Sequence, residues 1–222
     1  MAERITGHTE LIGLMAYPIR HSSSPAMQNE AFAKLGYDYA YLAFEVGADE
    51  IEDAVKAIRT LKMRGSNVSM PNKTLVGKYL DELSPAAELC GAVNTIVNDN
   101  GRLTGHITDG EGFVHNLKDH GIDIKGKKIT VAGGGGAATA IQVQCALDGA
   151  REISIFNIKD AFFERTLKTA EKIRAAVPSC VENVYDIADT ARMTAEIASS
   201  DIFANATIVG MKPMENESVV KD

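Results

Sequence analysis

A glycine-rich turn between an apolar run and an Ala-rich run has the spacing of a phosphate-binding loop. It reads Gly133-x-Gly135-Gly136-Ala137, a compact relative of the G-x-G-x-x-G/A pattern, and it follows the apolar residues 129–132. A strand that turns tightly into a helix leaves the first helical N–H groups unpaired at the positive dipole end, which favours a pyrophosphate. Glycines let that ligand approach the main chain closely. By itself the motif also fits a purely structural strand-to-helix turn.

Hydroxyl and ammonium groups that could bind or protonate a small molecule lie in two segments of the first half. Residues 17–25 contain Ser22 and Ser24, whose hydroxyls can donate hydrogen bonds to a carboxylate near a helix N-terminus. Alternatively, Ser24 only caps that helix. A later segment presents Ser69 and Lys73 after a short apolar run. An isolated lysine is usually a solvated surface charge. These residues therefore indicate a binding or catalytic site only in combination with other polar segments.

Further polar residues follow in the next two segments. Asn94 interrupts an apolar stretch, and Thr108 and Asp109 precede an expected helix, so turn formation or helix capping would explain each of them alone. All of these polar segments, however, adjoin expected strands, and ligands of α/β folds bind in the crevice beyond the carboxyl ends of the strands. There Lys73 could protonate the alkoxide that forms when hydride adds to a carbonyl, with Asp109 keeping the lysine charged.

Length and composition describe an ordinary globular protein of one large domain or two smaller ones. The chain has 222 residues, 45% of them hydrophobic and 24% charged, which is enough to bury a core. Its net charge of −7 argues against a nucleic-acid partner, because phosphate binding needs a basic face. No apolar run approaches the ~20 residues that cross a membrane, and the N-terminus lacks a signal-peptide core. The scattered Cys90, Cys145 and Cys180 predict buried, reduced thiols in a cytoplasmic protein, with no metal site.

Apolar periodicity predicts an α/β arrangement in the first half of the chain. Ser24, followed by Pro25, is the expected N-cap of a helix that Gly36 ends. The expected strands are residues 11–17, 39–46 and 64–68, with a hairpin of 92–98 and 102–105, and the expected helices are 25–35, 49–61, 74–83 and about 110–120.

A polar, glycine-containing connector at residues 121–127 leads into a second run of alternating strands and helices. We therefore expect two domains, residues 1–121 and 122–222. In the second, strands 128–132, 152–157, 181–185 and 202–206 alternate with helices 137–148, 161–176 and 187–199, which implies βαβ units and a parallel sheet. A full dinucleotide-binding sheet has about six strands, and the chain stops as an apolar segment begins. Either the sheet is unusually small or the second domain is truncated at its C-terminus, and we expect the truncation.

Taken in order, these motifs resemble the shikimate dehydrogenase family, most closely its quinate/shikimate dehydrogenase branch, over nearly the whole chain. Their agreement in order and spacing makes the resemblance specific. The motifs are Pro18-Ile19-Arg20-His21-Ser22-x-Ser24-Pro25, Asn67-Val68-Ser69-Met70-Pro71-Asn72-Lys73, Gly91-Ala92-Val93-Asn94-Thr95, Thr108-Asp109-Gly110, Gly133-x-Gly135-Gly136-Ala137 and Asn205-Ala206-Thr207-x-x-Gly210-Met211.

The resemblance implies an N-terminal α/β substrate domain and a C-terminal Rossmann-type dinucleotide-binding domain. It implies reversible NAD(P)-dependent reduction of 3-dehydroshikimate to shikimate, or of 3-dehydroquinate to quinate, in cytoplasmic aromatic amino acid biosynthesis. These small molecules are the implied partners, and a homodimer stays open. The implied site residues are, for catalysis, Lys73 and Asp109; for the substrate carboxylate, Ser22 and Ser24; for ring hydroxyls, Ser69, Asn94 and Thr108; and for the coenzyme, Gly133, Gly135, Gly136, Ala137, Asn157, Lys159, Asp160, Thr207, Gly210 and Met211.

The chain departs from the family pattern at positions that bear on specificity. Ser69 stands where Thr is commoner, which leaves room for the extra hydroxyl of quinate and favours the quinate/shikimate branch. Ile107 stands where relatives usually carry Asn. The run Asn157-Ile158-Lys159-Asp160 lacks the Arg that pairs with a 2′-phosphate, so we expect NAD to be preferred, with NADP as the alternative coenzyme.

Other functions stay open from the sequence. Because the chain stops early, it could be a catalytically weak or inactive fragment that retains the fold and ligand binding. A different two-domain Rossmann oxidoreductase, such as a methylene-tetrahydrofolate dehydrogenase, is disfavoured by the serine pair and by Lys73 and Asp109.

Overall fold

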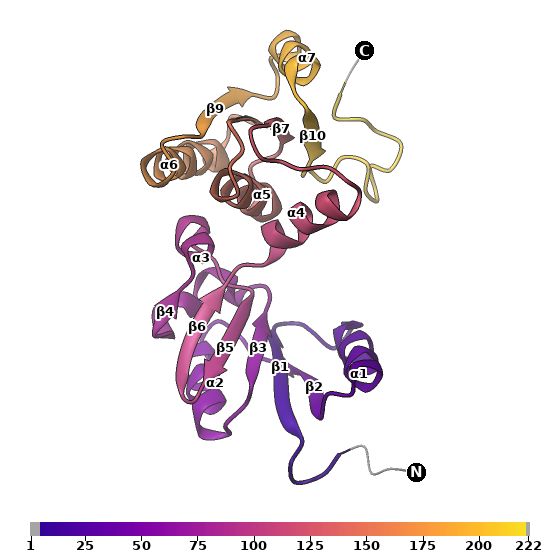
Figure 1. Cartoon of the computed structure of the whole chain (residues 1–222), viewed down its shortest axis with the longest axis vertical. Coiled ribbons are helices and arrows are strands. Elements are labelled where there is room, and N and C mark those ends of the chain that lie inside the picture. Colours follow the sequence, from indigo (N-terminus) through magenta and orange to yellow (C-terminus); the bar gives the residue numbers. More distant parts are fainter. Residues whose placement is uncertain (1–4, 221–222) are drawn as a thin grey trace. The chain divides into compact units, whose positions relative to one another are not determined.

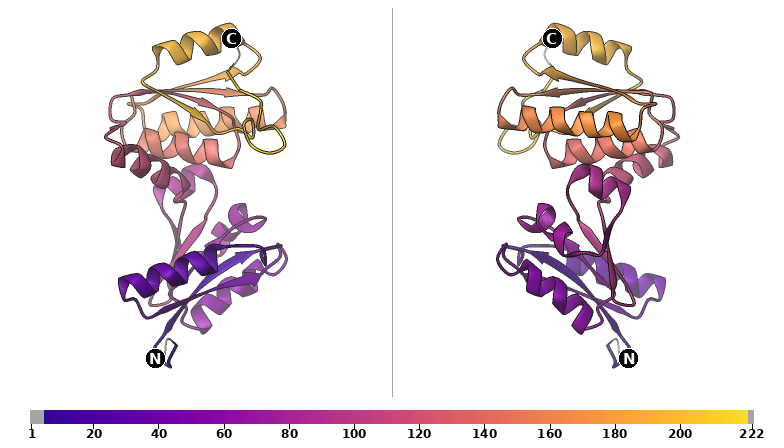
Figure 2. Two further views of the ribbon diagram at one scale, coloured as in Figure 1. Left: turned by 90° about the vertical axis from the view of Figure 1, so that its right-hand side faces the viewer. Right: turned by 90° about the vertical axis from the view of Figure 1, so that its left-hand side faces the viewer.

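The chain folds into two compact α/β units, residues Met1–Ile107 and Thr108–Asp222. The structure is a computed structural model that describes residues 5–220 (Figure 1). Each unit contains one sheet with helices packed against it (Figure 2). This confirms the expected α/β class.

The first unit is built on a 6-stranded sheet with the order β2-β1-β3-β5-β6-β4. Strands β2 and β3 both pair in parallel with β1, whereas β5 is antiparallel to both β3 and β6. The strands are β1 (Glu10–Ala16), β2 (Tyr39–Glu45), β3 (Gly65–Val68), β4 (Glu82–Leu83), β5 (Thr95–Asp99) and β6 (Arg102–His106). The helices are α1 (Ser24–Leu35), α2 (Ile51–Thr60) and α3 (Pro85–Cys90), with 3₁₀ turns η1 (Asn72–Thr74) and η2 (Val76–Tyr79).

Alternation along β1 places Leu14 and Ala16 on the sheet face that packs against α1. Both are buried in a cluster with Tyr41 of β2, and Phe32 of α1 packs against them. Because strand side chains alternate between faces, this cluster also fixes which polar side chains of β2 and β3 lie on the α1 face.

Two expectations for the first unit were wrong. Ser23, not Ser24, occupies the cap position of α1, and its side chain makes no capping hydrogen bond. The expected helix at residues 74–83 is instead the two 3₁₀ turns and β4. The Asp81 carboxylate accepts from the Leu103 N–H at 2.7 Å, and β4 pairs with β6, so sheet pairing overrides the local helical pattern. Helix α3 was not predicted.

The second unit contains a 4-stranded sheet, in the order β10-β7-β8-β9, with every pair parallel. The strands are β7 (Lys128–Ala132), β8 (Glu152–Asn157), β9 (Val181–Asp186) and β10 (Ile202–Asn205), and the helices are α4 (Asp109–Asp119), α5 (Gly136–Leu147), α6 (Ala161–Ala176) and α7 (Thr190–Ser199). Helices α5 and α6 cover one face of the sheet and α7 the other (Figure 2). The strand order places β10 and β8 on either side of β7.

Helix α4 belongs to the second unit by compactness, whereas the sequence analysis placed it before the domain boundary. Its packing on α5 explains the difference. A Cβ at Gly110 would collide with the main-chain oxygen of Ala140, so glycine is needed for α4 to approach the α5 backbone this closely.

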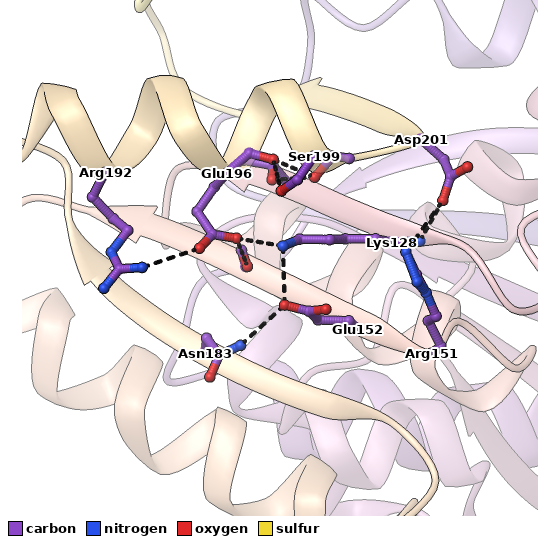
Figure 3. Close-up of polar contacts among 11 residues, drawn as sticks. Lys128, Arg151, Glu152, Asn183, Arg192, Glu196, Ser199 and Asp201 are labelled. Carbon is purple, nitrogen blue, oxygen red and sulfur yellow. Dashed lines mark hydrogen bonds and ion pairs between the residues drawn. The ribbon is translucent and has the colours of Figure 1, made fainter.

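A buried charge cluster holds the amino end of the second sheet (Figure 3). The Lys128 ammonium, at the start of β7, lies 2.7 Å from the Glu196 carboxylate and 3.1 Å from that of Glu152. Ser154 donates to Glu196 at 2.8 Å. The hydrogen bond to Glu196 raises the pKa of Lys128. This cluster lies at the opposite end of β7 from the glycine turn, so we assign it a structural role.

Cysteine and hydropathy expectations can be compared directly with the structure. Cys90, Cys145 and Cys180 are buried, as predicted, and none of the three forms a disulfide with another described residue. Within residues 5–220, no helix combines the length and apolar character that crossing a membrane requires.

Candidate active site

In the first unit, main-chain hydrogen bonds join the loop after β1 to the loop after β3. The Ser69 N–H donates to the Met15 carbonyl at 3.0 Å, and the Tyr17 N–H donates to the Met70 carbonyl at 3.1 Å. These bonds fix the expected serine segments side by side at the carboxyl end of the two neighbouring strands.

The serine hydroxyls are largely uncommitted. The Ser22 Oγ accepts a hydrogen bond from the Ser24 N–H at 3.2 Å, so its own proton can be donated elsewhere. Among residues 5–220, the hydroxyls of Ser24 and Ser69 have no hydrogen-bond partner, and all three serines are partly buried. Hydroxyls held this way are suited to bind a polar ligand.

Lys73 is held on η1 beside the segment that contains Asn94. Its carbonyl accepts from the Val93 N–H at 2.8 Å. The preceding Asn72 is fully buried and donates through its side chain to the Val46 carbonyl at 2.8 Å. These contacts fix the main chain of the turn, and with it the Cα position from which the partly buried Lys73 side chain extends.

Asn94 is fixed through its main chain as well as its side chain. Its N–H donates to the His106 carbonyl at 2.9 Å, and its carbonyl accepts from the Val68 N–H at 2.8 Å. The Thr95 hydroxyl donates to its Oδ1 at 3.0 Å. The structure therefore brings the segments that carry Ser69, Lys73 and Asn94 together at one edge of the first sheet.

Thr108 and Asp109 lie at the start of α4 and belong to the second unit. Thr108 occupies the cap position without a side-chain capping bond, and Asp109 is the first helical residue. Asp109 therefore lies one residue inside the helix and not at the cap position that the alternative explanation assigned to it. Its carboxylate is exposed near the positive end of the helix.

Glycine in the turn after β7 serves two different purposes. Gly133 has a φ of +113°, and a Cβ there would lie 2.8 Å from the Ala206 carbonyl. A Cβ at Gly134 would collide with the Asn157 amide. Around Gly135 and Gly136, by contrast, the structure has nothing within 4 Å of the corresponding position. The first two glycines permit packing, and the next two leave open space at the N-terminus of α5, a kind of position that binds anions in many proteins.

The loop after β10 lies next to the glycine turn, because Asn205 pairs with Ala132 in register. Its shape is set by Asn205, whose Oδ1 accepts from the Thr207 N–H at 3.0 Å and from the Thr207 hydroxyl at 2.7 Å. Gly210 has a φ of +92°, and Met211 is exposed. Sequence reasoning gave Asn205 no role, although the Asn-x-Thr spacing is a turn signal.

The residues after β8 have structural partners of their own. Asn157 is buried and donates to the Thr166 hydroxyl at 3.2 Å. The Lys159 ammonium lies 3.6 Å from the Asp186 carboxylate. Asp160 caps α6, accepting from the Phe162 N–H at 2.8 Å. All of the expected coenzyme residues thus lie at the carboxyl ends of β7, β8 and β10, where parallel sheets bind nucleotides.

Metal chemistry receives no support from the side chains. The described part of the chain contains no group of three or more His, Cys, Asp or Glu residues that could hold a metal ion.

Comparison with known proteins identifies shikimate dehydrogenases among the relatives of this chain. Residues 14–96 match the model of the shikimate dehydrogenase substrate binding domain. Over 220 residues the chain is 62% identical to a shikimate dehydrogenase (NADP(+)) of Listeria monocytogenes, covering 99% of this chain and 75% of that protein. A crystal structure of shikimate 5-dehydrogenase from Listeria monocytogenes, in complex with shikimate and NAD, is similar with a TM-score of 0.96 and 62% identity, over 100% of this chain and 76% of that one. Quinate dehydrogenase from Corynebacterium glutamicum is 26% identical with a TM-score of 0.82, over 96% of this chain and 75% of that one.

Proposed function

We propose that this chain, which belongs to the shikimate dehydrogenase family, reversibly reduces 3-dehydroshikimate to shikimate with a nicotinamide coenzyme. The observation that carries the proposal is the match of 62% identity over 99% of the chain. The site geometry supports it, because the matching segments supply hydroxyl, amide, ammonium and carboxylate groups. The proposal extends to a cytoplasmic role in aromatic amino acid synthesis.

Each proposed substrate contact follows from the chemistry of its side chain. Ser22 and Ser24 donate to the substrate carboxylate. Ser69 and Asn94 bind ring hydroxyls, with Thr108 as a third contact. A serine hydroxyl without an internal partner can bind a ligand at little cost in free energy, because no hydrogen bond within the protein has to be broken.

Proton transfer is assigned to Lys73, with Asp109 as its partner. The coenzyme, when bound, supplies or accepts the hydride. In the direction of reduction, Lys73 donates a proton to the oxygen that becomes a hydroxyl, and a nearby carboxylate favours the charged lysine that can do so. In the reverse direction Lys73 takes that proton back.

The second unit suits a dinucleotide at the glycine turn. The open space at Gly135 and Gly136 and the adjoining N-terminus of α5 accept a pyrophosphate, with Gly133 and Ala137 completing the turn. The loop of Thr207, Gly210 and Met211 adjoins it. Further along the same edge, Asn157, Lys159 and Asp160 face the adenosine side of the proposed site.

NAD is the preferred coenzyme in this proposal. The segment after β8 has no Arg for bidentate binding of a 2′-phosphate, Lys159 already pairs with Asp186, and the Listeria structure contains NAD. The Listeria relative named above carries NADP(+) in its name. The kcat/KM values for NAD and NADP measured side by side decide the point: a higher value for NADP would contradict the preference.

The test of the proposed reaction is oxidation of shikimate by NAD or NADP, followed as absorbance of the reduced coenzyme at alkaline pH. Lys73→Ala should lower kcat by about 10²- to 10⁴-fold with a modest change in the KM for shikimate. Lys78→Ala is the matched control, because Lys78 lies close by on η2 and contacts the Tyr79 ring.

Two results would contradict the proposal. No turnover by the unaltered chain despite measurable coenzyme binding would favour the alternative of an inactive fragment that keeps ligand binding. A kcat of Lys73→Ala within a few-fold of the unaltered chain would remove Lys73 as the proton donor.

A further inference from the structure

Asn72, the residue directly before Lys73, is completely buried although its side chain is polar. It is 0% exposed, and its Nδ2 donates to the Val46 carbonyl oxygen at 2.8 Å. A carbonyl can only accept a hydrogen bond, so the NH₂ group of the amide must be the end that faces Val46. The Oδ1 at the other end has no hydrogen-bond partner among the described residues. The side-chain hydrogen bonding of Asn72 therefore consists of one bond to the main chain of Val46.

This hydrogen bond joins segments that follow two different strands of the first sheet. Val46 comes directly after β2, Asn72 belongs to the turn after β3, and β1 lies between these two strands. The Val46 N–H also donates to the carbonyl oxygen of Ala16, the last residue of β1, at 3.0 Å. The carboxyl ends of three neighbouring parallel strands are thus connected. The end of β2, to which the sequence analysis gave no role, becomes part of the support of the candidate active site.

Main-chain hydrogen bonds pass the constraint on Asn72 to its neighbour Lys73. The Asn72 N–H donates to the Ser69 carbonyl at 2.9 Å, and its carbonyl accepts from the Leu75 N–H at 3.0 Å. Between them, the Lys73 carbonyl accepts from the Val93 N–H at 2.8 Å. A 3₁₀ turn as short as η1 has few hydrogen bonds of its own. An anchor outside the turn therefore has a large effect on where Lys73 lies.

Stability alone does not explain an asparagine at this position. One end of its amide is paired, but the other end is a buried oxygen without a partner, and burying such an atom costs free energy that offsets the hydrogen bond. An apolar side chain of similar size would fill the space without that cost. What the amide adds is a directional bond that fixes η1 relative to the end of β2.

We propose that Asn72 is a positioning residue that holds η1 at the end of β2 and so places the Lys73 ammonium for proton transfer. This inference rests on the proposed function, in which Lys73 donates the proton and takes it back. Displacing a reacting group by about 1 Å can lower the rate by about 10²-fold. Proton transfer occurs in the transition state, so loss of the anchor lowers kcat and leaves the KM for shikimate nearly unchanged.

The experiment measures shikimate oxidation by Asn72→Leu, which keeps a side chain of similar size, and by Asn72→Ala, which keeps none of the amide. Each should lower kcat by about 10- to 30-fold, per folded molecule counted by circular dichroism, with both KM values within about twofold of the unaltered chain. Two variants are used so that misfolding of one leaves the other. An unchanged kcat, or a raised KM with normal kcat, would overturn the inference.

A matched control separates positioning from a general loss of stability. Asn98 is also buried and donates through its Nδ2 to a main-chain carbonyl, that of Met63, at 2.7 Å. It lies at the opposite end of β3, where its N–H donates to the Arg64 carbonyl. Asn98→Leu should lower the stability of the first unit but keep kcat within about twofold. An equal loss of kcat in Asn98→Leu and Asn72→Leu would contradict a specific role for Asn72.

A double-mutant cycle tests whether Asn72 acts through Lys73. In the Lys73→Ala background there is no ammonium left to place, so adding Asn72→Leu should lower kcat by less than about twofold further. A merely structural role would instead give the same loss in both backgrounds. A full additional loss of about tenfold or more in the double variant would therefore overturn the inference.

A further readout needs no turnover. The Val93 N–H, which donates to the Lys73 carbonyl, reports on whether η1 is held in place. Its hydrogen exchange, followed by NMR, should be about tenfold faster in Asn72→Leu than in Asn98→Leu. Equal exchange in these two variants, beside a normal loss of activity in Lys73→Ala, would refute this inference alone. Full activity of Lys73→Ala would refute the proposed role of Lys73, so the two failures are told apart.

Discussion

Ser69 presents a hydroxyl without an internal partner on a backbone that is tied to β1. A threonine there would add a methyl group without removing the hydroxyl. The proposed consequence is selectivity between two ring acids that differ in substitution at C1, because quinate carries an additional hydroxyl and needs more room. In this proposal the small size of Ser69 affects substrate selectivity, in addition to the hydrogen bond that its hydroxyl can form.

Ser69→Thr should therefore lower the ratio of kcat/KM for quinate to that for shikimate by about tenfold, the usual effect of one misplaced methyl group in a fitted site. The measurement is steady-state oxidation of both substrates by the variant and by the unaltered chain. Ser179→Thr, at an exposed serine of the second unit, is the control. An unchanged ratio would remove the argument for quinate.

At the scale of elements, the outer edge of β2 is occupied by a side chain of α1. The Asn29 Nδ2 donates to the Tyr41 carbonyl at 2.9 Å, and the Tyr41 N–H donates to the Asn29 Oδ1 at 3.0 Å. One amide thus replaces a neighbouring strand at the middle of an edge strand. Open edges are prone to pairing with other chains, and this contact closes the edge while fixing α1 to the sheet.

Asn29→Ala should lower the free energy of unfolding by about 2 kcal/mol, because it leaves the Tyr41 N–H and carbonyl unpaired at a partly buried edge. Urea unfolding followed by circular dichroism measures the change. Gln28→Ala, on the neighbouring position of the same helix, should change stability by less than about 0.5 kcal/mol. Equal effects of the two substitutions would show that the edge contact contributes nothing.

Elements with a clear apolar pattern could be predicted, and those set by distant partners could not. Strands β7, β8 and β10 are short apolar runs bounded by polar residues, and their expected bounds differ from the observed ones by at most one residue. The prediction of a helix at residues 74–83 was wrong because the end of this segment pairs with β6, whose residues lie about 20 positions further along the chain. In the site, Ser69 and Lys73 were predicted from strand ends, whereas the hydrogen bonds between the loops after β1 and β3 follow only from the placement of β3 beside β1.

At the scale of the whole molecule, one buried carboxyl affects stability as a function of pH. Glu182 of β9 is 1% exposed, and neither carboxyl oxygen has a hydrogen-bond partner among the described residues. Its neighbours are the buried thiols of Cys145 and Cys180 and the guanidinium of Arg174, which donates to the Glu182 carbonyl at 2.9 Å. Burial, against a smaller opposing effect of Arg174, raises the pKa of Glu182 to about 8.

A raised pKa in the folded state means that stability is highest below the unfolded value near 4.5 and is lost as pH rises toward 8. Glu182→Gln removes this loss. The unfolding free energy of the variant relative to the unaltered chain should therefore rise between pH 5 and pH 8, by a total on the order of 3 kcal/mol. Denaturant unfolding at a series of pH values tests this, with Glu171→Gln on the exposed side of α6 as control. Parallel pH profiles for Glu182→Gln and the unaltered chain would contradict it.

Asp160 has a structural contact in addition to its proposed role in coenzyme binding. The carboxylate that we propose to bind the ribose also caps the longest helix of its unit, a contact worth about 1 kcal/mol in such positions. Engineering the coenzyme choice by replacing Asp160 with a cationic residue would therefore loosen α6 at its first turn. A redesign that keeps the aspartate and replaces the neighbouring Ile158, which is 61% exposed, would change the surface of the proposed adenosine site and leave the cap of α6 in place.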